Sequence, residues 1–221
     1  MYKYAIPSSC RLRMFKLKRD SIAIHRGNCK QISTGPELTH SLKMASLYQQ
    51  TIPVFIKYLK AMDGILVKGE KYADENEVKH DDMINYRIVP DMRGLAYQVQ
   101  SCSNTARFVL SRVGKIPHVA MEDNETTFAE LRERVARTIK ILEEFDPKAL
   151  DRPGDEALVM ETRAGKFSFT CQTYISEFAI PNFHFHLSTA YCILRGQKVP
   201  LEAWDYLRDV FHKVPDAEEE K

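Results

Sequence analysis

Residues 178–196 read FAIPNFHFHLSTAYCILRG and predict one long helix, apolar enough for a core element yet rich in polar side chains. Successive helical residues turn by about 100°, so His184 and His186 point about 200° apart and cannot both bind one ion. Four residues before His186, on the same face, is Asn182, and Thr189 lies close by. Any site on this helix is therefore predicted to combine His186 with Asn182, while His184 faces another way.

The composition is typical of a globular protein. The chain has 221 residues, of which 44% are hydrophobic and 28% charged, and this suits one domain with a sizeable core. The net charge of +2 averages two unlike parts. Residues 1–43 carry nine Lys and Arg against two acids, whereas residues 44–221 carry 23 against 28. Because the second part is mildly acidic, we expect no nucleic-acid binding by the domain.

The five cysteines are odd in number and contain no C-x-x-C pair. Scattered cysteines of this kind are typical of free thiols in a reducing compartment, so the sequence predicts a cytoplasmic protein. No run of about 18 apolar residues is available to cross a bilayer. The first residues also lack the compact apolar segment of a secretory signal. We therefore expect no membrane partner.

Residues 1–43 are basic and show no sustained period, and their role stays open. A composition rich in Arg, Lys and Ser and poor in acids suits an organelle-targeting presequence, which would make the protein mitochondrial. The interpretation that we favour is a disordered extension in front of a complete domain. A nucleic-acid-binding arm is a third alternative. Residues 214–221 are expected to form a charged disordered end.

Four long segments after this extension have apolar residues at helical spacing. Ser46 with Gln49, and Thr127 with Glu130, match the capping-box pattern, in which a hydroxyl and a side chain three residues later satisfy the first free backbone N–H groups. These two pairs predict where the first and third helices begin.

Other residues are expected to end or bend the helices. Pro53 should kink the first helix or move its start later, and Pro181 should kink the fourth, which runs from about residue 173 to 195. The charged residues 68–83 are expected to form a solvated connection after the first helix. Asp91, after a proline, is the expected N-cap of the second.

Residues 157–162 and 166–170 alternate in polarity around a Gly-containing turn and predict a β-hairpin, which needs a helical partner to be stable. A short amphipathic helix is expected over residues 201–212. Together these elements predict an all-α domain over residues 44–213. Its architecture would be an antiparallel four-helix bundle with a short β-hairpin before the last long helix.

Four blocks of the sequence resemble an uncharacterised family, the domain-of-unknown-function family numbered nineteen ninety-three, which is placed among the DinB/YfiT-like four-helix bundles. The blocks are SLYQQTIPVFIKYLKAM (46–62), RIVPDMRGLAYQVQ (87–100), MEDNETTFAELRERV (121–135) and FAIPNFHFHLSTAYCILRGQKVPL (178–201). They occur in order and extend the resemblance over residues 44–210. The resemblance leaves the basic extension outside.

The resemblance implies a site near one end of the bundle, because many DinB-like proteins hold a divalent metal there with three histidines. Carried over to this chain, His186 matches the last of these ligands, and Asn182 replaces the first histidine of the H-x-x-x-H pair. Asp91 or Gln98 replaces the remaining histidine. Amide oxygens do not hold Zn²⁺ as imidazoles do, so this set suits at most a weak Mn²⁺ or Mg²⁺ site with His186 and Asp91 as ligands. We therefore predict a degenerate metal site and no resident cofactor.

The first functional hypothesis is an enzyme with a small-molecule pocket at the bundle end, in which His186 is the general acid or base. The other proposed residues have these roles: Asp91 orients His186, Asn182 and Gln98 bind the substrate, and Tyr97, Thr189 and Tyr191 complete the pocket. In the competing interpretation the same polar groups form a satisfied buried network that sets the helix register.

A second hypothesis is a non-catalytic binding or scaffold protein, which could be a homodimer formed through an exposed helical face. A third follows from the resemblance: an accessory protein of a metabolic or specialised-metabolite pathway. An enclosed polar pocket with His186 would favour chemistry, and a large flat apolar patch would favour assembly.

Overall fold

The structure is a computed structural model that describes residues 45–207 and 209–213. It is mostly helical, with one small antiparallel hairpin. The elements are α1 (Leu47–Glu75), α2 (His80–Asn85), α3 (Leu95–Arg112), α4 (Phe128–Glu143), the 3₁₀-helix η1 (Pro147–Leu150), β1 (Ala157–Thr162), β2 (Gly165–Thr170), α5 (Cys171–Thr173), the π-helix η2 (Tyr174–Ala179), α6 (Ile180–Gly196) and α7 (Ala203–Leu207). The expectations for residues 1–43 and 214–221 lie outside the described residues.

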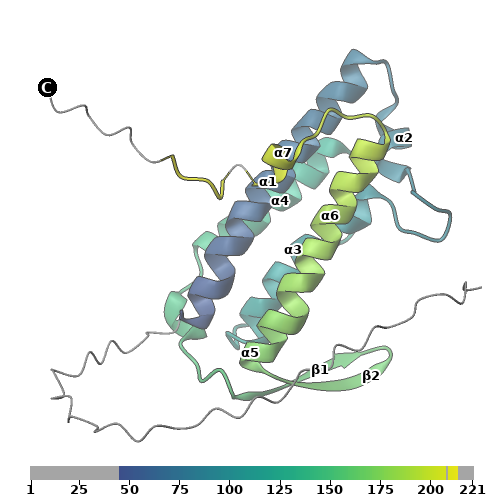
Figure 1. Cartoon of the computed structure of the whole chain (residues 1–221). Coiled ribbons are helices and arrows are strands. Elements are labelled where there is room, and N and C mark those ends of the chain that lie inside the picture. Colours follow the sequence, from purple (N-terminus) through teal and green to yellow (C-terminus); the bar gives the residue numbers. More distant parts are fainter. Residues whose placement is uncertain (1–44, 208, 214–221) are drawn as a thin grey trace, which may run out of the picture. The chain divides into compact units, whose positions relative to one another are not determined.

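Four long helices, α1, α3, α4 and α6, run side by side, and the hairpin lies at the end where α6 begins (Figure 1). α3 packs against α6 and α4, and α1 packs against α4, α3 and α6, around a single apolar core. Three hydrogen bonds show that α3 and α6 are antiparallel: along them the residue numbers rise on α3 and fall on the partner segment. Those contacts are Gln98 with His186, Thr105 with Asn182, and Arg112 with Tyr174 of the adjoining π-helix.

Helix α1 begins where the sequence predicts. The Ser46 hydroxyl accepts a hydrogen bond from the Gln49 N–H at 3.2 Å, and the Gln49 side chain accepts one from the Ser46 N–H at 3.1 Å. Pro53 lies inside the helix, so the expectation of a later start is wrong. Two turns of a capped helix already precede the proline, and they tolerate the loss of one backbone donor.

The expected solvated connection over residues 68–83 is also wrong. α1 continues to Glu75, and α2 begins only five residues later, at His80. Gly69 faces the core: a Cβ there would lie 3.1 Å from Leu194 and 3.2 Å from Phe128. Ala73 is completely buried. Because Gly69 and Ala73 are small, α4 and α6 can approach this end of α1. Their packing keeps the end of α1 helical.

Helix α3 begins three residues later than predicted. Its N-cap is Gly94, whereas Asp91 lies exposed in the preceding turn, so the assignment of Asp91 as N-cap is wrong. A Cβ on Gly94 would lie 2.9 Å from the carbonyl oxygen of Ile84. The backbone of α2 therefore approaches Gly94 closely, and this contact decides where the helix starts.

The irregularity near Pro181 takes a form that the sequence does not predict. The six residues before α6, Tyr174–Ala179, form a π-helix, and the Ile180 N–H donates to the Ile175 carbonyl, five residues back. Pro181 has no N–H, and its ring crowds the carbonyl four residues before it. A wider π-turn just upstream relieves that conflict.

The predicted hairpin is confirmed. β1 pairs with β2 in antiparallel register from Ala157–Thr170 to Thr162–Gly165, and Gly165 has a φ of +130°, which favours glycine. The final helix, α7, is shorter than expected, since it covers Ala203–Leu207. Within residues 45–207 and 209–213, no helix combines the length and apolarity needed to cross a bilayer.

Candidate functional site

A groove of about 410 Å³ lies between α3 and α6, with β1 and η2 at one end. Its volume is in the range typical of small-molecule sites. Side chains that line it include Tyr97, Asn104, Thr105, Phe108 and Arg112 of α3, Asp123, Met160 of β1, Tyr174 and Phe178 of η2, and Asn182 and His186 of α6. Three residues predicted for a site, Tyr97, Asn182 and His186, are thus brought to one surface.

His186 is held in a defined orientation by Gln98. The Nδ1 atom of His186 lies 2.8 Å from the Oε1 atom of Gln98, and the Gln98 amide nitrogen donates to the carbonyl of Arg93 at 3.0 Å. That second bond requires the amide group to point its oxygen at His186. Because the oxygen only accepts, Nδ1 carries the proton of the neutral imidazole and Nε2 carries the lone pair. Nε2 makes no hydrogen bond with the described residues and is available to a ligand.

Burial lowers the pKa of the half-buried His186 below its ordinary value of 6.5. The imidazole is therefore neutral near pH 7 and suited to accept a proton. Because the folded-state pKa is the lower one, the unfolded chain takes up this proton first as the pH falls. The associated contribution to stability is complete above pH 6.5 and is lost as the pH falls from there through the folded-state pKa.

We expect long-range ¹H–¹⁵N spectra at pH 7.5 to show His186 protonated on Nδ1 and not on Nε2. In the variant Gln98→Met this preference should disappear, because the acceptor that faces Nδ1 is removed. Gln100→Met is the matched control, since Gln100 is also buried on α3 but donates to Glu125 at 2.9 Å. An Nε2–H tautomer in the unmodified protein, or an unchanged spectrum in Gln98→Met, would contradict the geometry.

The other predicted site residues differ in how they relate to His186. The Asn182 amide donates to the Thr105 hydroxyl at 2.8 Å, and its oxygen has no partner among the described residues. The Tyr97 ring lies edge-on to the His186 ring, with centroids 5.8 Å apart. No hydrogen bond or ion pair joins the exposed Asp91 to His186, and Gln98 occupies the orienting position predicted for that carboxylate.

Thr189 and Tyr191 are not among the residues that line the groove. The buried Thr189 hydroxyl donates to the Phe185 carbonyl of its own helix at 2.7 Å. The Tyr191 hydroxyl donates to the Leu201 carbonyl at 3.2 Å, and its ring lines a separate hollow beside α7. The proposed pocket roles of these two residues therefore find no support in their positions.

His184 faces away from the groove, as the helical spacing predicts. Its Nδ1 atom lies 2.9 Å from the hydroxyl of Tyr206 on α7, and its ring stands edge-on to Tyr58 on α1 with centroids 4.5 Å apart. Burial lowers the pKa of His184. His184 therefore contacts both α7 and α1 and helps to hold α7 against the long helices.

The residues present do not fit a metal centre. Within the described parts of the chain, no group of three or more His, Cys, Asp or Glu side chains is arranged to hold an ion. At the positions that the resemblance assigns to metal ligands, His186 offers one nitrogen, Nε2, and Asn182 offers an amide oxygen, while no hydrogen bond or ion pair joins the exposed Asp91 to His186. A single imidazole with amide neighbours is a weak donor set for the metals that histidine sites bind.

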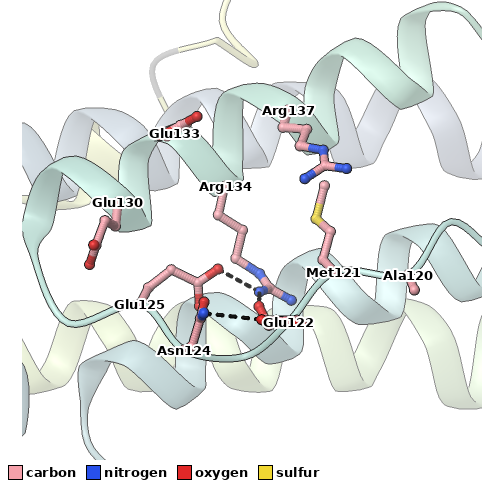
Figure 2. Close-up of a pocket in the computed structure, with 9 residues that line it drawn as sticks. All are labelled: Ala120, Met121, Glu122, Asn124, Glu125, Glu130, Glu133, Arg134 and Arg137. Atoms are coloured by element: carbon pink, nitrogen blue, oxygen red, sulfur yellow. Dashed lines mark hydrogen bonds and ion pairs between the residues drawn. The ribbon is translucent and has the colours of Figure 1, made fainter.

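A second hollow lies against α4 and is built around a buried arginine (Figure 2). The side chain of Arg134 is 1% exposed, and it donates to Glu125 at 2.6 Å and to Asp123 at 2.7 Å. It also donates to the Glu122 carbonyl and to Asn104, each at 2.8 Å. Nearly all donors of Arg134 are thus used to join the segment before α4 to α3 and α4, so this arginine is not available to a ligand.

Two buried arginines, Arg107 and Arg134, were not expected from the sequence. Arg107 is 2% exposed and donates to the Val119 carbonyl and to Asn104, and burial followed by the charge of Arg134 lowers its pKa to about 10. A signal for Arg134 was present: it lies three residues after Leu131 and four before Thr138, on the buried face of α4.

Comparison with known proteins agrees with the resemblance seen in the sequence. The model of the family described as "Domain of unknown function (DUF1993)" matches residues 47–207. A solved structure of a DinB family member protein from Shewanella denitrificans is 31% identical, with a TM-score of 0.68, and the match covers 78% of this chain and 95% of that one. No functionally curated protein matches. This chain therefore belongs to the DUF1993 family and is similar in structure to a DinB family member.

Proposed function

We propose that this protein binds a small organic molecule in the groove between α3 and α6, and that His186 acts on it as a general base or acid. The observation that carries this proposal is the fixed imidazole: Gln98 holds Nδ1 while Nε2 is left without a partner among the described residues. A purely structural histidine is expected to use both ring nitrogens or to face a dry core. His186 instead lines a groove large enough for a ligand.

The chemistry of the groove supports a proton-transfer role. A neutral imidazole with a lowered pKa accepts a proton in the physiological range, and an adjacent amide that fixes the tautomer keeps its lone pair in one direction. Asn182, one turn before His186, has a carbonyl oxygen that can accept a hydrogen bond from a ligand. Gln98 is then a positioning residue, the role first expected of Asp91.

The arrangement of the long helices also supports a small-molecule site in the groove. We infer that α1, α3, α4 and α6 form an antiparallel bundle of the DinB-like kind, with the groove on its α3–α6 side. A small-molecule site of this kind suits an accessory protein of a metabolic or specialised-metabolite pathway, and we propose a cytoplasmic setting on the basis of the free thiols. Neither nucleic acid nor membrane is a partner in this proposal.

The groove can be tested with a fragment library and the matched variants His186→Gln and His184→Gln. The two histidines lie on one helix and are both half-buried, but only His186 lines the groove. Bound fragments are expected to shift the NMR signals of His186 and Asn182 and not those of His184. Where the fragment donates to Nε2, affinity should fall as the pH is lowered through the pKa of His186, and this dependence should be absent in His186→Gln. Fragments that bind only elsewhere, or none at all, would refute the proposal.

A second candidate is a non-catalytic scaffold protein that forms homodimers. It is favoured by Trp204 and Phe211, which are 59% and 58% exposed and stack with centroids 5.3 Å apart. Exposed aromatic pairs are more common at interfaces than on free surfaces. A stable dimer in light scattering, together with no fragment binding near His186, would favour this candidate over the first.

A further inference from the structure

The end of the groove opposite His186 is built around Arg112, the last residue of α3. Its Nη1 atom donates to the Tyr174 hydroxyl at 2.9 Å and lies 3.4 Å from the Met160 sulfur. The guanidinium carbon lies 4.3 Å from the centroid of the Phe108 ring and 5.7 Å from that of Tyr174. These contacts hold a half-buried cation in one place at the groove surface.

No carboxylate among the described residues forms an ion pair with Arg112, whereas Arg132, Arg134 and Arg152 each have acidic partners. The one acid that lines the groove, Asp123, is bound by Arg134 at 2.7 Å and faces the amide of Asn104 at 3.3 Å. The charge of Asp123 is thus already compensated. Arg112 remains as a cation in the groove without a counter-charge among the residues that the structure describes.

Tyr174 holds Arg112 in place at this end of the groove. Its hydroxyl accepts from Arg112, and the hydroxyl proton has no acceptor among the described residues. The residue is completely buried, so its hydroxyl does not contact a ligand itself, and this burial raises the pKa of the phenol. Nε and Nη2 of Arg112 also make no hydrogen bond with the described residues. The unpaired N–H groups and the positive charge of Arg112 therefore lie together at this end of the groove.

We propose that Arg112, held in place by Tyr174, binds the carboxylate of an organic acid in this groove. The acid has an elongated apolar or aromatic body, which lies along Phe108 and Phe178. Its far end points towards Asn182 and His186.

The charge and length of the groove narrow the ligand class. A single arginine at the C-terminal end of a helix, where the helix dipole is negative, suits a monoanion better than a phosphate dianion. Arg112 and Gln98, which binds His186, are fourteen residues apart on α3, or about 21 Å at 1.5 Å per residue. A short acid such as acetate would reach Arg112 and leave the His186 end unfilled. This inference rests on the proposed function and names the substrate class for the same groove.

The test compares acids with their uncharged amides on the full chain. The probes are biphenyl-4-carboxylate, 4-phenylbutyrate and decanoate, each beside its primary amide, with inorganic phosphate as a further anion. Affinities are measured by titration calorimetry, and the site is located by NMR shifts of the tyrosine and arginine side chains. We expect at least one acid to bind about 10- to 100-fold more tightly than its amide, as charge-assisted hydrogen bonds allow. Phosphate is expected to bind more weakly than that acid.

Variants separate charge from shape. Arg112→Gln should remove the preference for the acid while leaving the affinity of the amide within a few fold, and Arg112→Lys should keep part of the preference because it keeps the charge. Tyr174→Phe should reduce the preference several fold. The proposal would be overturned by any one of four results. These are equal binding of acid and amide, a preference for the acid that survives Arg112→Gln, tighter binding of phosphate than of the acid, and no binding of any acid. These outcomes do not decide the proposed role of His186. Neutral fragments that shift the NMR signals of His186 would still support a small-molecule site in the groove.

Discussion

Replacing Arg134 with methionine is expected to lower the free energy of unfolding by about 3–5 kcal/mol, since removal of one partner leaves a buried charge uncompensated. The carboxylate left without its ion-pair partner is that of Glu125, whose side chain is 10% exposed and lies 2.6 Å from Arg134. Asn104 and the carbonyl of Glu122 lose a donor at the same time. Urea denaturation measures the loss, and for a domain of this size we expect a fall in Tm of roughly 2–4 °C per kcal/mol.

Arg132→Met is the matched control for this variant. Arg132 lies on the same helix and pairs with Asp63 at 3.0 Å, but its side chain is 40% exposed, so its loss should cost no more than about 1 kcal/mol. The double variant Arg134→Met with Glu125→Leu should recover part of the stability, because it removes the unpaired buried charge as well. Similar losses for Arg132 and Arg134, or no recovery in the double variant, would contradict this account.

Truncating Phe183 to alanine is expected to cost about 3–5 kcal/mol of unfolding free energy through lost burial and the cavity that remains. Phe183 is completely buried on α6, and its ring packs on that of Phe55 of α1 with centroids 4.8 Å apart. The sulfur of Cys102 donates to the Phe183 carbonyl at 3.4 Å, so α1, α3 and α6 all meet at this residue. Equilibrium denaturation of the variant gives the measurement.

Phe185→Ala provides the control, because Phe185 is two residues further along the same helix but is 62% exposed. Its truncation should change stability by no more than about 0.5 kcal/mol. A large loss at Phe185 with a small loss at Phe183 would show that α6 is rotated relative to the structure described, and would move His186 out of the groove.

Local sequence signals predicted much of the fold. The capping boxes at Ser46 and Thr127 join residues only three apart, and both are formed as expected. The hairpin turn is equally local. The predictions that were wrong concern helix ends that are set by contacts between residues far apart in the sequence. The end of α1 is helical because Gly69 packs against Leu194, and α3 begins at Gly94 because the backbone of α2 approaches it. No short-range pattern contains those contacts.

The sequence by itself determined the presence of the four long helices, the caps at Ser46 and Thr127, the family resemblance and the shared face of Asn182 and His186, because all of these depend on local spacing along the chain. Only the tertiary structure decided that Gln98 orients His186. It likewise decided that Arg112 meets Tyr174, 62 residues later. Hydrogen bonds across a helix interface depend on the register and rotation of two packed helices, and those quantities are set by the whole core rather than by either helix alone.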